Sequence, residues 1–163
     1  MDICLVKFNK AKHFNCLEEL VTNKEVYSHL GNGREWSQDK IHKLFDYVNT
    51  DDETLATKSP HFYRVIESSV DDDFIGFLGI HPVNYDKKGN LYLTIAILER
   101  YQAQGIGRRA ITKLLSDFKT VNSTKFIFAD VHNTNIPSKK LMEKCGFLKI
   151  KKNKFRTTYF TLI

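Results

Sequence analysis

Apolar residues in the first third of the chain recur at helical spacing. A short apolar run at residues 3–8 predicts a first strand, and residues 14–21 then place apolar side chains every three or four positions. A second set with this spacing follows Ser37 and consists of Ile41, Leu44, Phe45 and Val48. This spacing predicts two amphipathic helices, and Ser37 is a suitable N-cap for the second. A polar connection over residues 50–60 ends at Pro60.

Between residues 61 and 98 the pattern becomes that of β-strands. Two apolar runs, residues 61–68 and 73–80, are separated by an acidic turn over Ser69–Asp73, which predicts an antiparallel hairpin. A second turn at residues 84–90 leads to Leu91–Leu98, where nearly continuous apolar residues predict a central strand covered on both faces.

The last third alternates helices and strands. The pattern predicts a helix at 106–118, a strand at 125–132, and a helix at 137–145 that Gly146 ends as a left-handed C-cap. Two closing strands follow. Because the chain shows no repeat and no internal linker, we expect residues 1–163 to form one α+β domain (α/β three-layer), with a mixed, mostly antiparallel central sheet flanked by helices.

Composition narrows the class of protein. The 163 residues are 42% hydrophobic and 27% charged, as is usual in soluble globular domains. No apolar run approaches the roughly 18 residues of a membrane span, and the N-terminus lacks the order of a signal peptide. We therefore expect a cytoplasmic protein with no membrane partner. Its three cysteines are widely spaced and its six histidines show no ligand spacing, so no metal is expected.

The net charge of +6 is unevenly spread. Acidic clusters lie at Asp51–Glu53 and Asp71–Asp73, and basic residues crowd the end of the chain. Those basic residues are Lys139, Lys140, Lys144, Lys149, Lys151, Lys152, Lys154 and Arg156. They suit a phosphorylated ligand or polyanion, or strand edges that lysine protects from aggregation. Nucleic acid is not an expected partner, except near the ribosome.

The loop between the central strand and the helix at 106–118 points most directly to a ligand. It places Gly105 and Gly107 at a helix N-terminus, where bare backbone N–H groups can hold phosphate. Taken alone, Gly105-x-Gly107-x-x-Ala110 fits a dinucleotide fingerprint, with Asp130 about twenty residues further on. In that fingerprint, however, the glycines closely follow the strand, whereas six polar residues intervene here. The dinucleotide site stays an alternative.

Two motifs together resemble those of the GNAT superfamily of acetyl-CoA-dependent N-acetyltransferases. The loop reads Gln102-x-x-Gly105-x-Gly107, and Asn135 opens a second motif that ends in the residues EKCGF at 143–147. The order of strands and helices is also similar. Within the superfamily, Trp36-Ser37 and the N-x-x-S form of the second motif are similar to the ribosomal-protein N-terminal acetyltransferase group.

The resemblance implies acetyl-CoA as co-substrate. Backbone N–H groups of the loop would bind its diphosphate, the central strand would lie along its pantetheine arm, and Asn135 would hydrogen-bond to that arm or cap the following helix. The implied cofactor-binding residues are Ile95, Ala96, Ile97, Gln102, Ala103, Gln104, Gly105, Ile106, Gly107, Arg108 and Asn135. The two glycines would allow a close approach because they carry no Cβ.

The catalytic residues that the resemblance implies are Ser138 and Asp130. Many members carry a tyrosine seven residues after the motif asparagine, as acid for the leaving thiolate. This chain has Met142 there, so Ser138, as in the ribosomal-type members, is the candidate donor. Asp130 corresponds to a glutamate that acts as general base in some members, with His132 on the same face of the strand. Glu99 is a further candidate, and an amine can also lose its proton to water.

These observations predict an enzyme that moves an acetyl group from acetyl-CoA to a primary amine, by direct attack in a ternary complex. The acceptor is expected to be a protein N-terminus or a small molecule. The positive net charge disfavours a polyamine unless the acidic clusters lie at the acceptor side. Trp36 either lines the acceptor cleft or packs into the core. Two alternatives stay open: an acetyl-CoA-binding module with weak turnover, and a basic nucleic-acid-binding domain built on residues 147–156.

Overall fold

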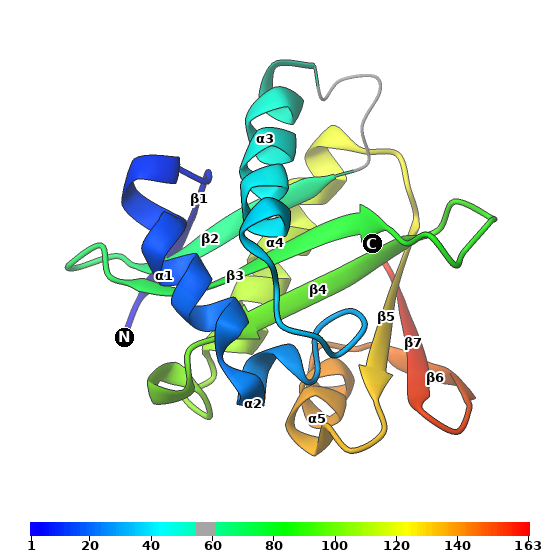
Figure 1. Ribbon diagram of the computed structural model, residues 1–163. Coiled ribbons are helices and arrows are strands. Elements are labelled where there is room, and N and C mark those ends of the chain that lie inside the picture. The colour runs from blue at the N-terminus through cyan, green and yellow to red at the C-terminus, as the bar shows by residue number, and fades with distance from the viewer. Residues whose placement is uncertain (55–60) are drawn as a thin grey trace.

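Seven strands form one twisted sheet in the computed structural model, which describes residues 1–54 and 61–163, with backbone alone for 49–54 (Figure 1). Their order is β1-β2-β3-β4-β5-β7-β6, and every neighbouring pair is antiparallel except β4 with β5. The strands are β1 (Ile3–Val6), β2 (Phe62–Ser68), β3 (Phe74–Pro82), β4 (Leu91–Ile97), β5 (Phe126–His132), β6 (Leu148–Lys152) and β7 (Arg156–Leu162). The helices are α1 (Lys10–Thr22), α2 (Lys24–Tyr27), α3 (Gln38–Thr54), α4 (Ile106–Val121) and α5 (Ile136–Lys144), with a 3₁₀ turn η1 (Glu99–Tyr101). The predicted mixed sheet flanked by helices is confirmed.

Helices cover both faces of the sheet. In Figure 1, α1 and α3 lie in front of it and α4 lies behind. The core behind the sheet joins strand residues such as Leu78 to Leu114 of α4, and the core in front joins Phe77 to Phe45 of α3. Because β4 contributes side chains to both cores, the prediction that Leu91–Leu98 is a central strand covered on both faces is confirmed.

The strands β4 and β5 pair over only two residues and then diverge. Their parallel ladder joins Leu91 to Ile127 and Tyr92 to Phe128. In contrast, β5 stays paired with β7 along all of Phe126–His132. Beyond Tyr92 a V-shaped opening therefore widens toward the C-terminal ends of β4 and β5, where α5 and the loop after β4 flank it (Figure 1). We call this opening the V.

The sequence pattern located most elements, but α1 begins at Lys10, four residues before the predicted start, and α2 and η1 were not predicted. Ser37 precedes α3 as predicted, and its Oγ accepts the N–H of Lys40 at 3.3 Å. Gly146 has the left-handed φ of 82° expected of a C-cap. The prediction of a connection from residue 50 is wrong for residues 50–54, which continue α3. Polar residues do not end a helix where no Gly or Pro interrupts it. Residues 55–60 of that connection lie outside the described residues.

Candidate functional site

The loop after β4 is held by its own side chains. Gln102 Nε2 donates to the carbonyl of Ile97 at 2.8 Å, and Gln104 Nε2 donates to a carbonyl of η1 at 2.8 Å. Ala103 and Gly105 both adopt left-handed backbone, with φ of 59° and 75°. Together these features turn the chain sharply from the end of β4 into α4.

The turn exposes a row of backbone donors at the start of α4. Within the described residues, the N–H groups of residues 103–108 donate to no protein acceptor, and the N–H of Arg109 makes the first bond of the helix, to Gly105 at 3.3 Å. The helix N-terminus adds positive partial charge. Unpaired N–H groups at such a position suit a diphosphate, so the donor set fits the acetyl-CoA expected from the sequence.

The two glycines of the loop meet different requirements. At Gly105 a Cβ would contact only Arg109 Nη1, at 3.7 Å, so the positive φ rather than space requires glycine there. A Cβ on Gly107 would lie 3.0 Å from Leu141 Cδ2 and 3.5 Å from Ile97 Cδ1. Gly107 therefore lets α4 pack closely against α5 and β4. Its approach to a ligand stays a prediction.

A basic surface adjoins the loop on the outer side of α4. Arg108 and Arg109 are exposed there, and Arg109 Nη2 donates to the carbonyl of Met1 at 3.1 Å. An open hollow of about 640 Å³ borders this surface and is lined by Gly105, Arg108, Arg109, Thr112, Lys113, Ser116 and Asp117. Because it adjoins the loop and not the V, it suits the phosphorylated end of a ligand and not the reacting end.

The wall of the V on the β4 side contains the three strand residues predicted to bind the cofactor. Ile95 and Ile97 pack toward the core behind the sheet, and Ala96 packs toward the core in front. Beyond Tyr92, the β4 edge that faces β5 pairs with no described strand. Its backbone groups are available to a ligand in the V, as the resemblance implies.

On the opposite wall, α5 begins with a capped turn. Asn135 Oδ1 accepts the N–H of Ser138 at 3.1 Å, so Asn135 is the N-cap of α5. Ser138 is half-buried in this first turn. Met142 is 2% exposed and belongs to the core behind the sheet. The cofactor contact of Asn135 and the acid role of Ser138 stay predictions.

Asp130 lies on β5, just beyond the last residue paired with β4. Its Oδ1 accepts the hydroxyl of Thr158 at 2.6 Å, and its Oδ2 accepts the hydroxyl of Tyr85 at 2.7 Å. Burial and the bond to Asp130 raise the pKa of Tyr85, so this hydroxyl remains a donor. Tyr85 comes from the turn between β3 and β4. The carboxylate is thus held from two sides at the narrow end of the V.

Two residues that the sequence motifs did not single out, His81 and Thr94, lie on the other side of this narrow end. His81 Nε2 lies 2.8 Å from Thr94 Oγ1, and His81 Nδ1 lies 2.9 Å from the carbonyl oxygen of Pro82. Continuing the register of the last β4–β5 pair places Thr94 across from Asp130. The antiparallel pairing of β3 with β4 brings His81 to Thr94, and no motif spacing signals that contact.

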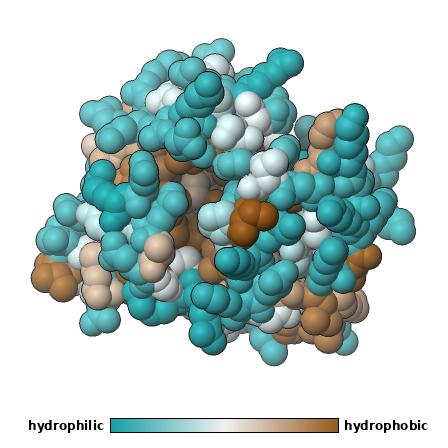
Figure 2. Space-filling view, turned by 90° about the horizontal axis from the view of Figure 1, so that it is seen from below, coloured by the Kyte–Doolittle hydropathy of each residue, from teal (hydrophilic) through white to brown (hydrophobic). Residues whose placement is uncertain are grey.

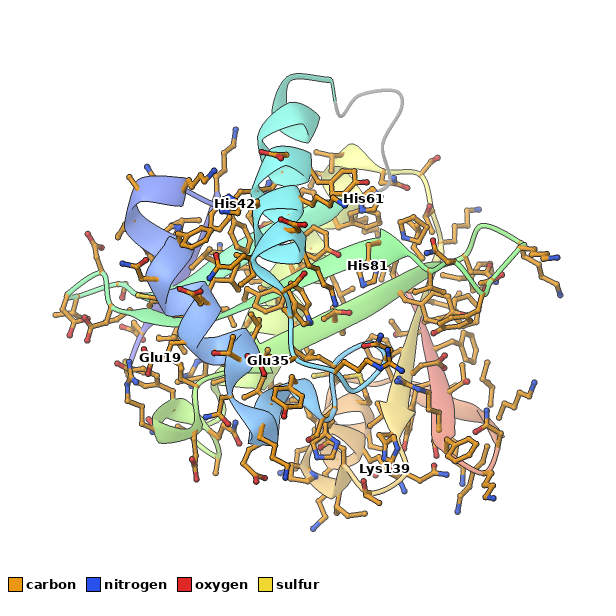
Figure 3. The ribbon with its side chains drawn as sticks, in the orientation of Figure 1. Glu19, Glu35, His42, His61, His81 and Lys139 are labelled. Atoms are coloured by element: carbon orange, nitrogen blue, oxygen red, sulfur yellow. The ribbon has the colours of Figure 1, made fainter. Side chains whose placement is uncertain are left out.

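A row of stacked rings holds the His81 ring in its orientation. Tyr47, His61, Tyr63 and His81 stack in succession, with centroid separations of 5.4, 6.3 and 5.5 Å. Gly79 makes room for the row, because a Cβ there would lie 2.1 Å from Tyr63 Cδ1. Figure 3 shows His61 and His81 on the front of the sheet beside α3. Burial lowers the pKa of His81 below its ordinary 6.5, and His61 adds to this effect while the bond to the Pro82 carbonyl opposes it.

The segment between α2 and α3 crosses the front of the sheet near the V. Arg156 Nη2 of β7 donates to the carbonyl of Gly31 in this segment, and the rings of His29 and His132 lie 6.0 Å apart. Trp36 packs against the front core. Among the described residues, His29 Nδ1 and Trp36 Nε1 are buried without a hydrogen-bond partner. Because buried polar atoms are normally paired, these two nitrogens mark places for a bound acceptor or water.

From the open end of the V, the surface is hollowed, with apolar atoms in the hollow and polar residues around it (Figure 2). The acidic cluster Asp71–Asp73 lies in the turn between β2 and β3, where the Ser69 N–H donates to the Asp2 carbonyl at 3.2 Å and Asp73 Oδ2 accepts the hydroxyl of Tyr101 in η1 at 3.4 Å. The side chains of the other acidic cluster, Asp51–Glu53, lie outside the part of the chain whose side chains the structure describes. Lys149, Lys151 and Lys152 lie on the exposed edge strand β6, as expected of lysines that protect an edge.

No group of three or more His, Cys, Asp or Glu side chains within residues 1–54 and 61–163 is placed to hold a metal ion. In the same part of the chain, none of the helices has the length and apolar character needed to cross a membrane.

Residues 23–147 match the Acetyltransferase (GNAT) family, and the chain belongs to that family. The matched range includes the loop, both walls of the V and α5. The family predicted from the two motifs is thereby confirmed, and acetyl-CoA is the co-substrate of that family. The antiparallel neighbours on the other sides of β4 and β5 also argue against the dinucleotide alternative, because that fingerprint belongs to a doubly wound, mostly parallel sheet.

One curated relative is the spermine/spermidine N(1)-acetyltransferase of Bacillus subtilis (strain 168). It is 29% identical over 96 residues, which span 55% of this chain and 62% of that protein.

Solved structures share the fold at low identity. A domain from Methanocaldococcus jannaschii DSM 2661 has a TM-score of 0.78 and 18% identity, covering 99% of both chains. A spermidine N-acetyltransferase from Vibrio cholerae, in complex with CoA and spermine, has a TM-score of 0.77 and 18% identity, covering 98% of this chain and 95% of that one. A ribosomal-protein-S5-alanine acetyltransferase from Vibrio fischeri has a TM-score of 0.75 and 15% identity, covering 98% and 91%.

Proposed function

We propose that this protein transfers an acetyl group from acetyl-CoA to a primary amine, by direct attack in a ternary complex. The observation that carries the proposal is the V between β4 and β5. Unpaired N–H donors of residues 103–108 flank its wide end, and fixed polar side chains stand at its narrow end. This arrangement suits a ligand with a diphosphate at one end and a reacting group at the other.

Different side chains around the V are suited to different steps of the reaction. Acetyl-CoA supplies an acetyl thioester, which an uncharged amine can attack. Asp130 was predicted as the base, but both of its oxygens already receive hydroxyl hydrogens from Tyr85 and Thr158. Their remaining lone pairs can hold the ammonium group of an incoming acceptor, so Asp130 is better suited to binding the acceptor than to storing a proton. Ser138 would donate to the departing sulfur from the first turn of α5.

A small polyamine is the acceptor that the observations favour. The relative from Bacillus subtilis is named for spermine and spermidine. Despite the net charge of +6, two carboxylates on the front side of the sheet can attract a polycation: Asp130 lies beside the V, next to the Arg156 guanidinium, and Glu35 lies in front of the sheet, on the same side as His81 (Figure 3). Opposite charges on the two partners favour both binding and encounter.

A protein N-terminus is the second acceptor class. His29 Nδ1 and Trp36 Nε1 carry the observation in its favour, because these unpartnered nitrogens can bond to peptide groups that a polyamine lacks. The Trp36-Ser37 sequence and the N-x-x-S motif also resemble the ribosomal-protein acetyltransferase group. The positive net charge of this chain is compatible with docking near ribosomal RNA.

The test has two stages, and the first is ligand binding followed by thermal unfolding. Acetyl-CoA at a hundred times its Kd should add about 2.7 kcal/mol to the free energy of unfolding, and NAD and ATP should add nothing. Gly105→Ala and Gly89→Ala each force alanine into a similar backbone, with φ of 75° and 73°, at roughly 1–2 kcal/mol. Only Gly105 lies in the loop, so only Gly105→Ala should also reduce the acetyl-CoA shift. An equal shift in both variants would refute the proposed phosphate site.

The second stage measures release of free thiol from acetyl-CoA with spermidine, with spermine, and with a peptide bearing a free alanine N-terminus. Release with the polyamines alone supports the first acceptor class, and release with the peptide alone supports the second. An acetyl-CoA shift without thiol release from any amine would leave only the binding module with weak turnover.

A further inference from the structure

We propose that His81, acting through the hydroxyl of Thr94, takes the proton that the acceptor amine must lose. The proposal rests on the proposed function and adds a proton acceptor to it. Neither residue belongs to the two sequence motifs, and they come together only because β3 pairs with β4.

The hydrogen bonds of His81 determine where its hydrogen lies. A carbonyl oxygen can only accept, so the 2.9 Å contact with Pro82 requires the hydrogen on Nδ1. In the neutral ring, Nε2 then carries the lone pair and accepts the hydroxyl hydrogen of Thr94 at 2.8 Å. The hydroxyl oxygen of Thr94 keeps its own lone pairs. A proton that reaches Thr94 Oγ1 can therefore pass to His81 Nε2 without any movement of heavy atoms.

Thr94 is placed to meet the acceptor. It lies two residues beyond Tyr92, the last β4 residue paired with β5, and side chains two apart on a strand share a face. It is half-buried. Across the V, the fixed carboxylate of Asp130 can hold an ammonium group. An amine between Asp130 and Thr94 would have the carboxylate on one side. On the other side, the hydroxyl oxygen of Thr94 could accept its proton.

The surroundings keep His81 oriented and uncharged before the reaction. The Tyr63 ring stacks on it at 5.5 Å and 16°, and His61 stacks on the far side of Tyr63. Among the described residues, a further ionisable group beside it is Tyr92, its register partner on β4, whose hydroxyl donates to Asp86 at 2.8 Å. Burial holds the pKa of His81 below 6.5, so the ring enters the reaction neutral at neutral pH.

The step balances without a further reactant. One N–H bond of the ammonium breaks, its proton goes to Thr94 Oγ1, and the Thr94 hydroxyl proton goes to His81 Nε2. The nitrogen lone pair then forms the bond to the acetyl carbon, and the carbon–sulfur bond breaks. The amine's second proton goes to the departing sulfur, to which the Ser138 hydroxyl donates a hydrogen bond, and His81 later releases its proton to water.

The test is the pH dependence of kcat/KM for thiol release with spermidine. In the unaltered protein, kcat/KM should rise with pH and level off once His81 is neutral, at a pH below the ordinary histidine value of 6.5. His81→Gln and Thr94→Val should each lower kcat/KM at neutral pH by roughly a hundredfold or more. Both should also lose the plateau, since the free amine alone then reacts and its fraction rises about tenfold per pH unit.

Three matched measurements separate this role from a structural one. Thr94→Ser keeps the hydroxyl and should restore the plateau. His61→Gln removes a neighbour that lowers the pKa of His81, so the plateau should remain but begin at a higher pH. The acetyl-CoA shift of the thermal midpoint should be unchanged in all variants, which shows that they fold and bind.

A plateau that survives in His81→Gln and disappears in Asp130→Asn would overturn the proposal and make Asp130 the base. Failure of the unaltered protein to release thiol with any amine would instead overturn the proposed function, and the proton acceptor with it.

Discussion

Removal of the Glu67 carboxylate is expected to destabilise the protein strongly, because it breaks a buried cluster. Glu67 on β2 is 3% exposed, and its Oε1 lies 2.7 Å from both His13 Nε2 and Lys12 Nζ of α1. The N–H of Asn9 donates to His13 Nδ1 at 2.9 Å. His13 Nδ1 therefore carries no hydrogen, and its Nε2 must donate to Glu67. The cluster fastens the first turn of α1 to the sheet.

The geometry sets the size of the effect. A hydrogen bond to a charged group contributes about 1.5–3 kcal/mol, and a buried donor left without an acceptor costs about 1–3 kcal/mol. Glu67→Leu removes the acceptor and leaves the His13 Nε2–H buried, so we expect a loss of about 3 kcal/mol. Glu67→Gln keeps an oxygen for His13 and should lose less. When His13→Leu accompanies Glu67→Leu, neither polar group remains, and part of the loss should be recovered.

The assay is urea unfolding of the unaltered protein, the two single leucine variants and the double variant. With a slope of about 1–3 kcal/mol per molar urea, a loss of about 3 kcal/mol shifts the midpoint by roughly 1 M or more. The double-mutant cycle should give a coupling of about 1.5–3 kcal/mol. A coupling below about 0.5 kcal/mol, the range of independent sites, would refute the reasoning. Lys12→Met is the control for the exposed side of the cluster, and added salt should weaken its effect.

Two further predictions concern packing and alkaline pH. Gly107→Ala places a Cβ 3.0 Å from Leu141 Cδ2, so overpacking of about 1–3 kcal/mol opposes the roughly 1 kcal/mol that alanine gains over glycine in a helix, and we expect a net loss of up to about 2 kcal/mol. In urea unfolding, combining it with Leu141→Ala should cost less than the sum of the two, and simple additivity would contradict the contact. Burial raises the pKa of Tyr63 well above 10, so the folded state keeps a proton that the unfolded state releases. The free energy of unfolding should therefore fall as pH rises above about 10, the stability being fully present below that value. Urea unfolding between pH 8 and 11 tests this, and an equally steep fall in Tyr63→Phe would count against it.

The sequence predicted those parts of the site that depend on local geometry. A left-handed glycine, a helix N-terminus and an N-cap each involve residues close together in the chain, so the pattern around Gly105 and Asn135 revealed the loop and the start of α5. Contacts made by strand pairing were not predictable in this way. Tyr85 reaches Asp130 across 45 positions, and His81 reaches Thr94 across 13. Their registers follow from the whole sheet and leave no motif.

The pattern of apolar and polar residues also did not predict that β4 diverges from β5. The run Leu91–Leu98 has the composition of a buried strand, and a buried strand looks the same whether its neighbour is another strand or a ligand. The same limit explains Gly107. Gly107 has no left-handed backbone that would require glycine. The reason for glycine there is visible only in the folded structure, where Leu141 of α5 packs against it and leaves little room for a Cβ.

Packing contacts hold the V open from both sides. Behind it, the side chain of Leu141 sits against Gly107, so α5 is fixed to the start of α4. In front of it, Arg156 joins β7 to the carbonyl of Gly31. Since β5 pairs with β7 along its whole length, holding β7 also holds β5 away from β4. A preformed opening spares the ligand the cost of separating two strands. It also leaves the edge of β4 beyond Tyr92 unpaired with β5, so that its backbone groups are available to a ligand.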